Sequence, residues 1–239
     1  TLGAARERVR VIGNLKFDMA LPEASIDDGA RLRARFGSRP VWIAASTHDG
    51  EEEAALSAHA AVVELQPDAL LVLVPRHPQR FDAVWSLIED SGLAGERRSR
   101  LAALDKSGHT PALAETQVFL GDSMGEMFLY LGMADVAFVG GSLVPIGGHN
   151  VLEPAALGLP VLFGPHMHNF VAARELLLEK VAAVEVADAA QLAEELAVLL
   201  AHPERCQAMG AAGEATVVGN RGALKRLLTI IEAQVPACA

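Results

Sequence analysis

The segment from Val139 to Pro154 holds the densest group of residues able to bind an anion. It reads VGGSLVPIGGHNVLEP, so one Gly-Gly pair follows an apolar run and a second leads into His149, Asn150 and Glu153. Glycine lets backbone N–H groups approach an anion closely, and the start of a helix presents N–H groups without helical partners. The segment therefore predicts a strand, an anion-binding loop and a helix. The alternative is a plain turn whose glycines only permit tight packing.

Side chains suited to a phosphate or a sugar follow other apolar runs. Arg76 and Arg80 can each pair with a phosphate through two N–H groups, although Arg80 could equally form a surface salt bridge. Lys16 could neutralise a departing phosphate, and Glu126 could accept a hydrogen bond from a ribose hydroxyl or a base amine. The carboxylates of Asp49 and residues 51–53 fit the first turn of a helix, where the helix dipole favours negative charge.

Apolar runs alternate with helical patterns along the chain, which predicts βαβ units and one doubly wound parallel sheet of six or seven strands, a Rossmann-like α/β fold. Polar clusters follow most of these runs, and ligands of such sheets bind at the carboxyl ends of the strands. The irregular stretch Gly92–Pro111 predicts a short strand and a loop. The predicted strands are Val9–Ile12, Val41–Ser46, Ala69–Pro75, Gln117–Leu120, Val136–Val139, Pro160–Gly164 and Ala183–Val186. The predicted helices are Ile26–Phe36, Gly50–Leu65, Gln79–Asp90, Met127–Met133, Leu152–Leu157, Phe170–Lys180, Ala189–Leu200, Pro203–Val218 and Ala223–Glu232.

Composition narrows the class of protein. The chain has 239 residues and a net charge of −10, which argues against general binding of nucleic acid. Its two cysteines, Cys206 and Cys238, have no metal-binding spacing and fit a reducing compartment. No apolar run reaches the ~18 residues of a membrane span. The chain starts at Thr1 without a signal peptide, so we expect a fragment of a longer protein, forming a single domain over residues 1–239.

Five ordered motifs together resemble one family. They are Gly13–Lys16, Ala45–His48 with Glu51–Glu53, Pro75–Pro78, Gly121–Glu126 and Gly140–Pro154. This set is similar to the C-terminal half of 3-deoxy-D-manno-octulosonic acid (Kdo) transferases, glycosyltransferases of lipopolysaccharide inner-core synthesis. The likeness runs from about Arg8 to Ile231. Val151 stands where many members have proline, and Asp49 and Met167 also vary.

The resemblance implies the two-domain GT-B architecture, with this chain as the domain that binds the donor CMP-Kdo. It places the acceptor site for a lipid A precursor, the catalytic glutamate base and the membrane attachment in an N-terminal half outside this chain. The parent enzyme would act at the cytoplasmic face of the bacterial inner membrane, and the fragment alone would be soluble and inactive. Lys16 is expected to stabilise the transition state. The expected substrate-binding residues are Pro75, Arg76, Met124, Gly125, Glu126, Gly141, Ser142, Gly147, Gly148, His149, Asn150, Val151, Leu152 and Glu153.

Other functions remain open from the sequence. Another GT-B sugar-nucleotide enzyme, such as a hexose transferase or an epimerase, would share the fold. A metal-dependent hydrolase could use His149, Glu153 and His166 as ligands. However, HExxH, GxSxG and Walker-A motifs do not occur, and fixed N–H groups with Lys16 and Arg76 could do the work of a cation. We therefore expect no metal and no cofactor. A pure interaction module is disfavoured by the many polar clusters.

Overall fold

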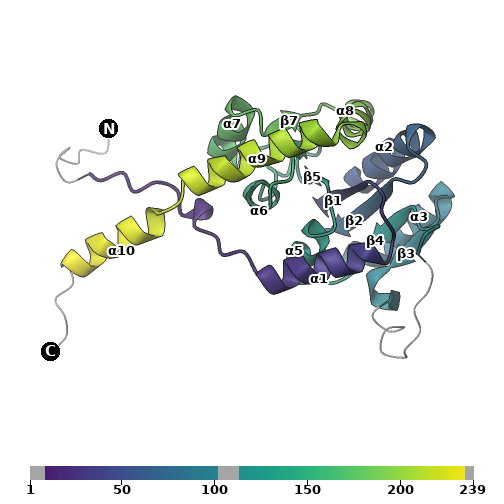
Figure 1. Ribbon diagram of the computed structural model, residues 1–239, viewed down its shortest axis with the longest axis horizontal. Helices are drawn as coiled ribbons and strands as arrows, with labels where there is room; N and C mark the ends of the chain where they lie inside the picture. The colour runs from purple at the N-terminus through teal and green to yellow at the C-terminus, as the bar shows by residue number, and fades with distance from the viewer. Residues whose placement is uncertain (1–8, 102–112, 235–239) are drawn as a thin grey trace.

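A parallel β-sheet forms the centre of the molecule, whose computed structural model describes residues 9–101 and 113–234. Within these residues the sheet has seven strands in the order β3-β4-β2-β1-β5-β6-β7, and every neighbouring pair is parallel (Figure 1). The strands are β1 (Val41–Thr47), β2 (Leu70–Pro75), β3 (Gly95–Arg97), β4 (Val118–Leu120), β5 (Val136–Val139), β6 (Val161–Phe163) and β7 (Ala183–Glu185).

Helices cover both faces of this sheet, which is why its strands are apolar throughout rather than alternating. Trp42 and Ala44 of β1 pack toward α2, α3 and α8, whereas Ile43 and Ala45 pack toward α1 and α5. A third cluster joins β5 and β6 to α6, α7 and α9. The helices are α1 (Glu23–Ala34), α2 (Glu51–Leu65), α3 (Phe81–Ser91), α5 (Met127–Leu131), α6 (Leu152–Ala156), α7 (Val171–Glu179), α8 (Ala189–Ala201), α9 (Pro203–Gly219) and α10 (Ala223–Gln234), with 3₁₀ turns η2 (Leu15–Phe17) and η3 (Pro78–Arg80).

The strand order reverses between β1 and β5. From β1 the chain proceeds through β2 toward one edge of the sheet, and from β5 through β6 and β7 toward the other. Such a reversal opens a crevice between the two loops that leave the carboxyl ends of the central strands. The loop after β1 begins at His48 and the loop after β5 begins at Gly140, so the glycine-rich segment lies at this crevice.

The predicted strands and helices are confirmed with one exception. Val9–Ile12 is not a strand: it runs as extended chain beside α10, where the Arg226 side chain donates to the carbonyl of Ile12, and Val11 is 91% exposed. Val9, Val11 and Ile12 give this segment the apolar pattern of a strand, but none of the described strands pairs with it. The short strand predicted within Gly92–Pro111 is β3; residues 102–112 lie outside the described part.

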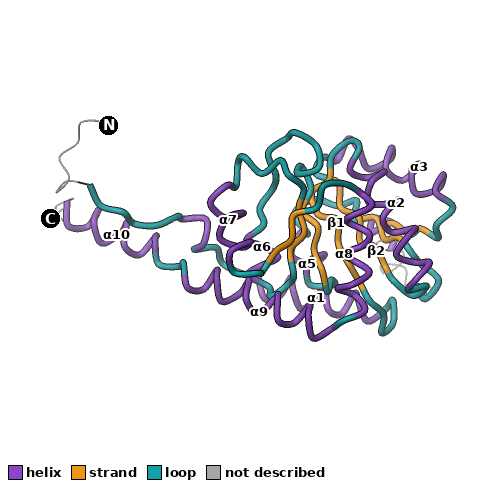
Figure 2. Tube along the Cα trace, turned by 90° about the horizontal axis from the view of Figure 1, so that it is seen from above, coloured by secondary structure: helices purple, strands orange, loops and turns teal. Residues whose placement is uncertain are grey.

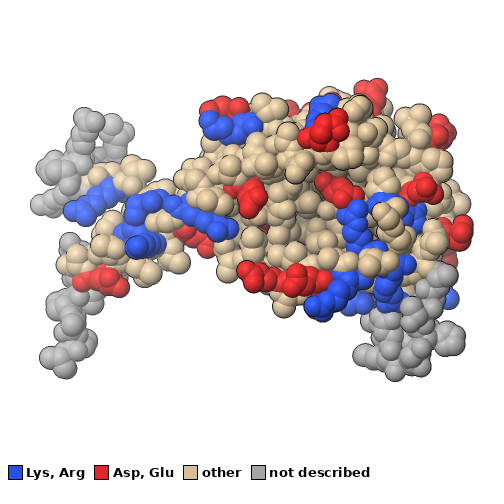
Figure 3. All heavy atoms as spheres, viewed as in Figure 1, with Lys and Arg blue, Asp and Glu red and all other residues tan. Residues whose placement is uncertain are grey.

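The end of the chain projects from the body of the molecule. Figures 1 and 2 show α10 extending away from the sheet, with the start of the described chain beside it. In Figure 3 acidic side chains are spread over the face in view, whereas most basic ones gather on this projection and on the right-hand and lower right part of the body.

Candidate functional site

Two adjoining cavities lie at the carboxyl ends of the central strands. The larger measures about 260 Å³ and lies between the ends of β1 and β5 and helices α5 and α6. The smaller measures about 100 Å³ and shares Ser46, Arg76 and Met127 with the larger. The larger is lined by Ala45, Ser46, Arg76, Met127, Leu131, Val139, His149, Asn150, Glu153 and Pro154. The smaller is lined by Ser46, Val74, Pro75, Arg76, Ser123, Met124, Gly125, Met127 and Tyr130. Seven of the residues predicted to bind substrate therefore meet here: Pro75, Arg76, Met124, Gly125, His149, Asn150 and Glu153.

The two arginines after β2 have different surroundings. Arg80 pairs with Glu52 through two hydrogen bonds of 3.1 Å and with Asp49 at 2.8 Å, so it forms the salt bridge that was its alternative interpretation. Arg76 is exposed at the mouth of both cavities. Within the described residues its guanidinium has no ion pair or side-chain hydrogen bond, which leaves its N–H groups for an anion.

Glu153 brings a carboxylate to the wall of the larger cavity. It is half-buried in the first turn of α6, and its Oε1 accepts one hydrogen bond of 3.0 Å from the side chain of Asn150. Burial raises the pKa of Glu153, while the Asn150 hydrogen bond and the charge of Arg76 oppose that rise. A desolvated carboxylate with acceptor capacity left over favours a ligand that brings hydroxyl or amine donors.

Three histidines surround the mouth of the crevice. The Nε2 atoms of His48 and His149 lie 2.7 Å apart in nearly coplanar rings, and His77 meets His48 edge-on. One Nε2 must donate to the other, so at least one imidazole is unprotonated. Burial is the largest cause that lowers the pKa of both rings, to about 4 for His149. Both are therefore neutral near pH 7 and act as hydrogen-bonding groups rather than cations.

Glu126 is engaged by the protein itself. Its carboxylate accepts two hydrogen bonds from Arg98, of 2.9 and 3.1 Å, and another from Ser123. Asp122, nearby in the same turn, accepts from Arg97 and from Ser99. The turn that brings Met124 and Gly125 to the smaller cavity is thus held from two sides by residues 97–99. A nucleotide contact of Glu126 stays a prediction, and its present partners make it a group that fixes this turn.

The first glycine pair is closed around an internal carboxylate. The N–H groups of Gly141, Ser142 and Leu143 all donate to Glu51. Those of Gly147 and Gly148 donate to the carbonyl of Gly141, at 3.1 and 2.7 Å. The anion that the N–H groups of Gly141 and Ser142 bind in this structure is therefore Glu51, which corrects the expectation that they point at a ligand; the N–H group of Gly140 donates to the carbonyl of Ala45. Sequence reasoning placed residues 51–53 in the first turn of a helix, a structural role that suffices for Glu52 and Glu53, and missed this contact of Glu51.

The remaining predicted residues lie around the cavities rather than in them. Val151 and Leu152 are fully buried in the cluster under α6 and support its first turn. Lys16 in η2 is exposed, with its Nζ 3.9 Å from the centre of the Phe170 ring and 3.4 Å from the carbonyl of Asn169. Asn169 in turn bonds the carbonyls of Ile146 and Gly147, so Lys16 lies on the same edge of the sheet as the glycine-rich segment.

The described residues hold neither a cluster of metal ligands nor a helix able to span a membrane. Among residues 9–101 and 113–234, no three histidine, cysteine, aspartate or glutamate side chains are grouped closely enough to hold a metal ion. The proposed hydrolase set is not assembled, because His149 bonds His48 while Glu153 bonds Asn150. In the same described part, every helix is too short or too polar to cross a bilayer.

The fold and the position of the cavities define the class: a Rossmann-like domain of the GT-B glycosyltransferase type. Among solved structures, the C-terminal CMP-Kdo binding domain of WaaA from Acinetobacter baumannii superposes with a TM-score of 0.73 at 35% identity, covering 82% of this chain and 98% of that one. HepE from Anabaena, in complex with UDP and glucose, superposes at 0.60 with 14% identity over 97% of this chain and 58% of that one, which shows the fold alone.

Sequence relatives give the family. The Kdo transferase of Haemophilus influenzae is 42% identical over 97% of this chain and 53% of its own length, and that of Bordetella pertussis is 41% identical over 93% and 51%. No protein-family model matches the chain. The chain belongs to the 3-deoxy-D-manno-octulosonic acid transferase family. It spans about half the length of these relatives and corresponds to the C-terminal domain.

Proposed function

We propose that this chain is the donor-binding domain of a Kdo transferase and that CMP-Kdo binds in the two adjoining cavities. The observation that carries the proposal is the meeting of Arg76, Asn150 and Glu153 at one crevice of the sheet. The family relationship to a CMP-Kdo binding domain supports the choice of nucleotide. Arg76 would bind the phosphate, Glu153 would accept from the ribose hydroxyls, and the turn at Met124 and Gly125 would face the base.

The transfer reaction requires an attacking hydroxyl and a base. We propose that the acceptor is a lipid A precursor, and that its site, the general base and the attachment to the inner membrane belong to an N-terminal domain of the parent protein. Lys16 would approach the donor from η2 and stabilise the charge that develops on the departing phosphate. Its present distance of 3.4 Å to the carbonyl of Asn169 is a contact of an exposed side chain, which a bound anion can replace.

The experiment that tests donor binding is a calorimetric titration of the 239-residue chain with CMP and GMP, with UMP as a third arm. We expect CMP to bind more tightly than GMP. Affinity is expected to be modest, because a lone domain lacks a closed cleft. GMP binding as tight as CMP binding contradicts the proposal. Preference for UMP would favour another GT-B sugar-nucleotide enzyme, the alternative with the same fold.

A further inference from the structure

We propose that Glu51 is a positioning residue of the nucleotide site. Its carboxylate joins the loop after β1 to the loop after β5 and thereby sets the His48–His149 pair at the mouth of the larger cavity. This inference rests on the proposed function for its effect on nucleotide affinity, whereas its effect on the loops is a property of the ligand-free chain.

Glu51 is fully buried, and its two carboxylate oxygens accept four backbone N–H groups. Oε1 accepts from Ser142 and Leu143, both at 2.9 Å. Oε2 accepts from His48 at 3.0 Å and from Gly141 at 2.6 Å. The four donors come from two loops about 90 residues apart in the chain, and they meet because β1 and β5 are neighbours in the sheet. A buried carboxylate is stable only with such a full set of donors.

The contact is transmitted to the cavity through the backbone of Gly141. While its N–H group donates to Glu51, its carbonyl accepts from Gly147 and Gly148, the residues that lead directly into His149. On the other side, Glu51 fixes the N–H group of His48. Glu51 therefore holds both histidines whose Nε2 atoms lie 2.7 Å apart: His48 through its own N–H group, and His149 indirectly through Gly141 and Gly148.

The glycines of the first pair fit this arrangement sterically. A Cβ on Gly140 would lie 2.9 Å from Oε2 of Glu51 and 2.7 Å from the carbonyl oxygen of Ser46. Gly141 has a φ of +66°, and a Cβ there would lie 3.0 Å from the imidazole of His149. The Gly-Gly motif is thus shaped by the approach of Glu51 on one side and of His149 on the other.

Residues 51–53 separate into different roles by their contacts. Glu53 is exposed, and within the described residues its carboxylate accepts just the N–H group of Gly50, at 3.1 Å, as a helix cap does. Glu52 is buried against Arg80. Favourable interaction with the helix dipole accounts for the place of Glu53, but it explains neither the burial of Glu51 nor the donors that Glu51 receives from the loop after β5. Of these three glutamates, only Glu51 joins the loop after β1 to the loop after β5 within the described residues.

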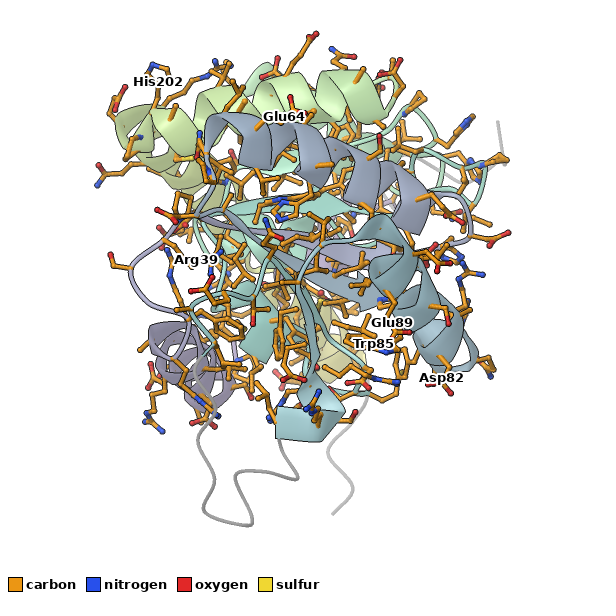
Figure 4. The ribbon with its side chains drawn as sticks, turned by 90° about the vertical axis from the view of Figure 1, so that its right-hand side faces the viewer. Arg39, Glu64, Asp82, Trp85, Glu89 and His202 are labelled. Carbon is orange, nitrogen blue, oxygen red and sulfur yellow. The ribbon has the colours of Figure 1, made fainter. Side chains whose placement is uncertain are left out.

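The variant Glu51→Gln tests this proposal because it keeps the shape of the side chain. Whichever way the amide is turned, its NH₂ group faces two N–H donors, either His48 and Gly141 or Ser142 and Leu143. The matched control is Glu64→Gln, on the exposed surface of the same helix (Figure 4). Both variants are assayed for CMP affinity, for urea unfolding and, without ligand, for the side-chain N–H signals of the histidines by ¹H–¹⁵N spectroscopy.

We expect Glu51→Gln to lose the slowly exchanging Nε2–H signal of the His48–His149 pair and to bind CMP about tenfold or more weakly, with Glu64→Gln within about twofold of the parent. A folded Glu51→Gln chain that keeps the histidine signal overturns the positioning role, whatever its affinity. Loss of the signal with unchanged CMP affinity overturns the effect on the site. If the parent itself does not bind CMP, the proposed function fails, while the histidine signal still decides whether Glu51 positions the loops.

A second measurement on the parent chain covers the case in which Glu51→Gln does not fold. Hydrogen exchange of the Gly141, Ser142 and Leu143 amides should be as slow as that of the core strands β1 and β5, because all three protons are bonded to a buried carboxylate. Exchange at the rate of an exposed loop would show that Glu51 does not hold this segment and would overturn the proposal.

Discussion

Glu51 and Glu153 occupy equivalent places in the chain, in the first turn of the helix that follows a central strand, yet their surroundings differ. Glu51 is fully buried and has four N–H partners, all from the backbone. Glu153 is half-buried and, within the described residues, has one side-chain partner, Asn150, and a raised pKa. The first carboxylate has its hydrogen-bonding capacity filled by the protein. The second keeps capacity for a ligand and lies on a cavity wall.

This difference separates two requirements of a nucleotide site. The loops that bind a phosphate must have a fixed conformation. Their buried N–H groups also need a hydrogen-bond acceptor within the protein when no ligand is bound. Glu51 supplies that acceptor for the first glycine pair. Glu153 and Arg76 are incompletely paired, which costs stability but leaves them for the ligand. Changes at Glu51 should therefore lower the stability of the fold as well as the affinity for the ligand, whereas changes at Glu153 should lower the affinity with little effect on stability.

The largest expected effect is on the rate of Kdo transfer, and it depends on whether Glu51 or Glu153 acts as a general base. Glu51 is enclosed, and Glu153 faces the donor cavity, so we predict that the 239-residue chain alone transfers no Kdo from CMP-Kdo to a lipid A precursor. A positioned base contributes about 10²–10⁴-fold, and holding the acceptor in place contributes further. The assay compares the chain with a full-length relative, such as the Kdo transferase of Haemophilus influenzae, in detergent. Turnover within about a hundredfold of that enzyme would contradict the proposal that the base belongs to another domain.

The second prediction concerns stability. Glu51→Ala leaves four N–H groups in the interior without an acceptor, and an unsatisfied buried group costs roughly 1–3 kcal/mol. We expect the free energy of unfolding to fall by at least ~3 kcal/mol, since the losses are only partly additive. Glu153→Ala removes one hydrogen bond and a desolvated carboxylate, so its effect should stay within ~1 kcal/mol. Urea unfolding of both variants measures the difference; similar losses for both would remove the distinction.

The secondary structure was predictable because the apolar runs have the length and punctuation of buried strands and the helices begin and end where expected. Which loops meet was harder to predict, since it depends on the order of strands in the sheet. The contact of Glu51 with Gly141 and that of His48 with His149 both require β1 beside β5, across about 90 and 100 residues. The sequence alone also could not separate Glu51 from Glu53, because both fit the first turn of α2. The wrong prediction of a strand at Val9–Ile12 has the same cause: the segment has the apolar pattern, but no described strand lies beside it to pair with.

The third prediction concerns His59 in the core and His149 at the site, whose pKa values are both lowered to about 4. His59 is buried in the core, where its Nδ1 accepts from Trp42 and its Nε2 bonds the carbonyl of Gln117. The unfolded chain binds this proton near pH 6.5 and the folded chain only near pH 4, so stability falls as the pH drops through this interval. The loss from His59 should approach ~3 kcal/mol at the lower end, since one pKa unit corresponds to about 1.4 kcal/mol.

The variant His59→Gln isolates this contribution, because glutamine can accept from Trp42 and donate to Gln117 without titrating. Urea unfolding at pH 7, 6 and 5 should show a shallower pH dependence for His59→Gln than for the parent chain, with His48 and His149 contributing to the dependence that remains. Identical slopes for variant and parent would show that His59 does not remain neutral in the fold.

The smallest expected effect concerns affinity. Losing a hydrogen bond to a charged group costs roughly 1.5–3 kcal/mol, so Arg76→Ala and Glu153→Ala should each weaken CMP binding by about tenfold to a hundredfold. Because both side chains lie at the cavities and outside the core, the variants should unfold at nearly the parent's urea concentration. Arg80→Ala, which removes the ion pairs to Glu52 and Asp49, serves as the control for Arg76→Ala. It should lower the free energy of unfolding more than it lowers the affinity for CMP.

The most direct test of the central claim is a crystal structure of the 239-residue chain with CMP. The account predicts the phosphate at Arg76, the ribose hydroxyls at Glu153 and Glu51 still bonded to the N–H groups of Gly141, Ser142 and Leu143. A phosphate bound by those three N–H groups with Glu51 displaced would contradict the account, as would CMP bound away from the crevice between β1 and β5.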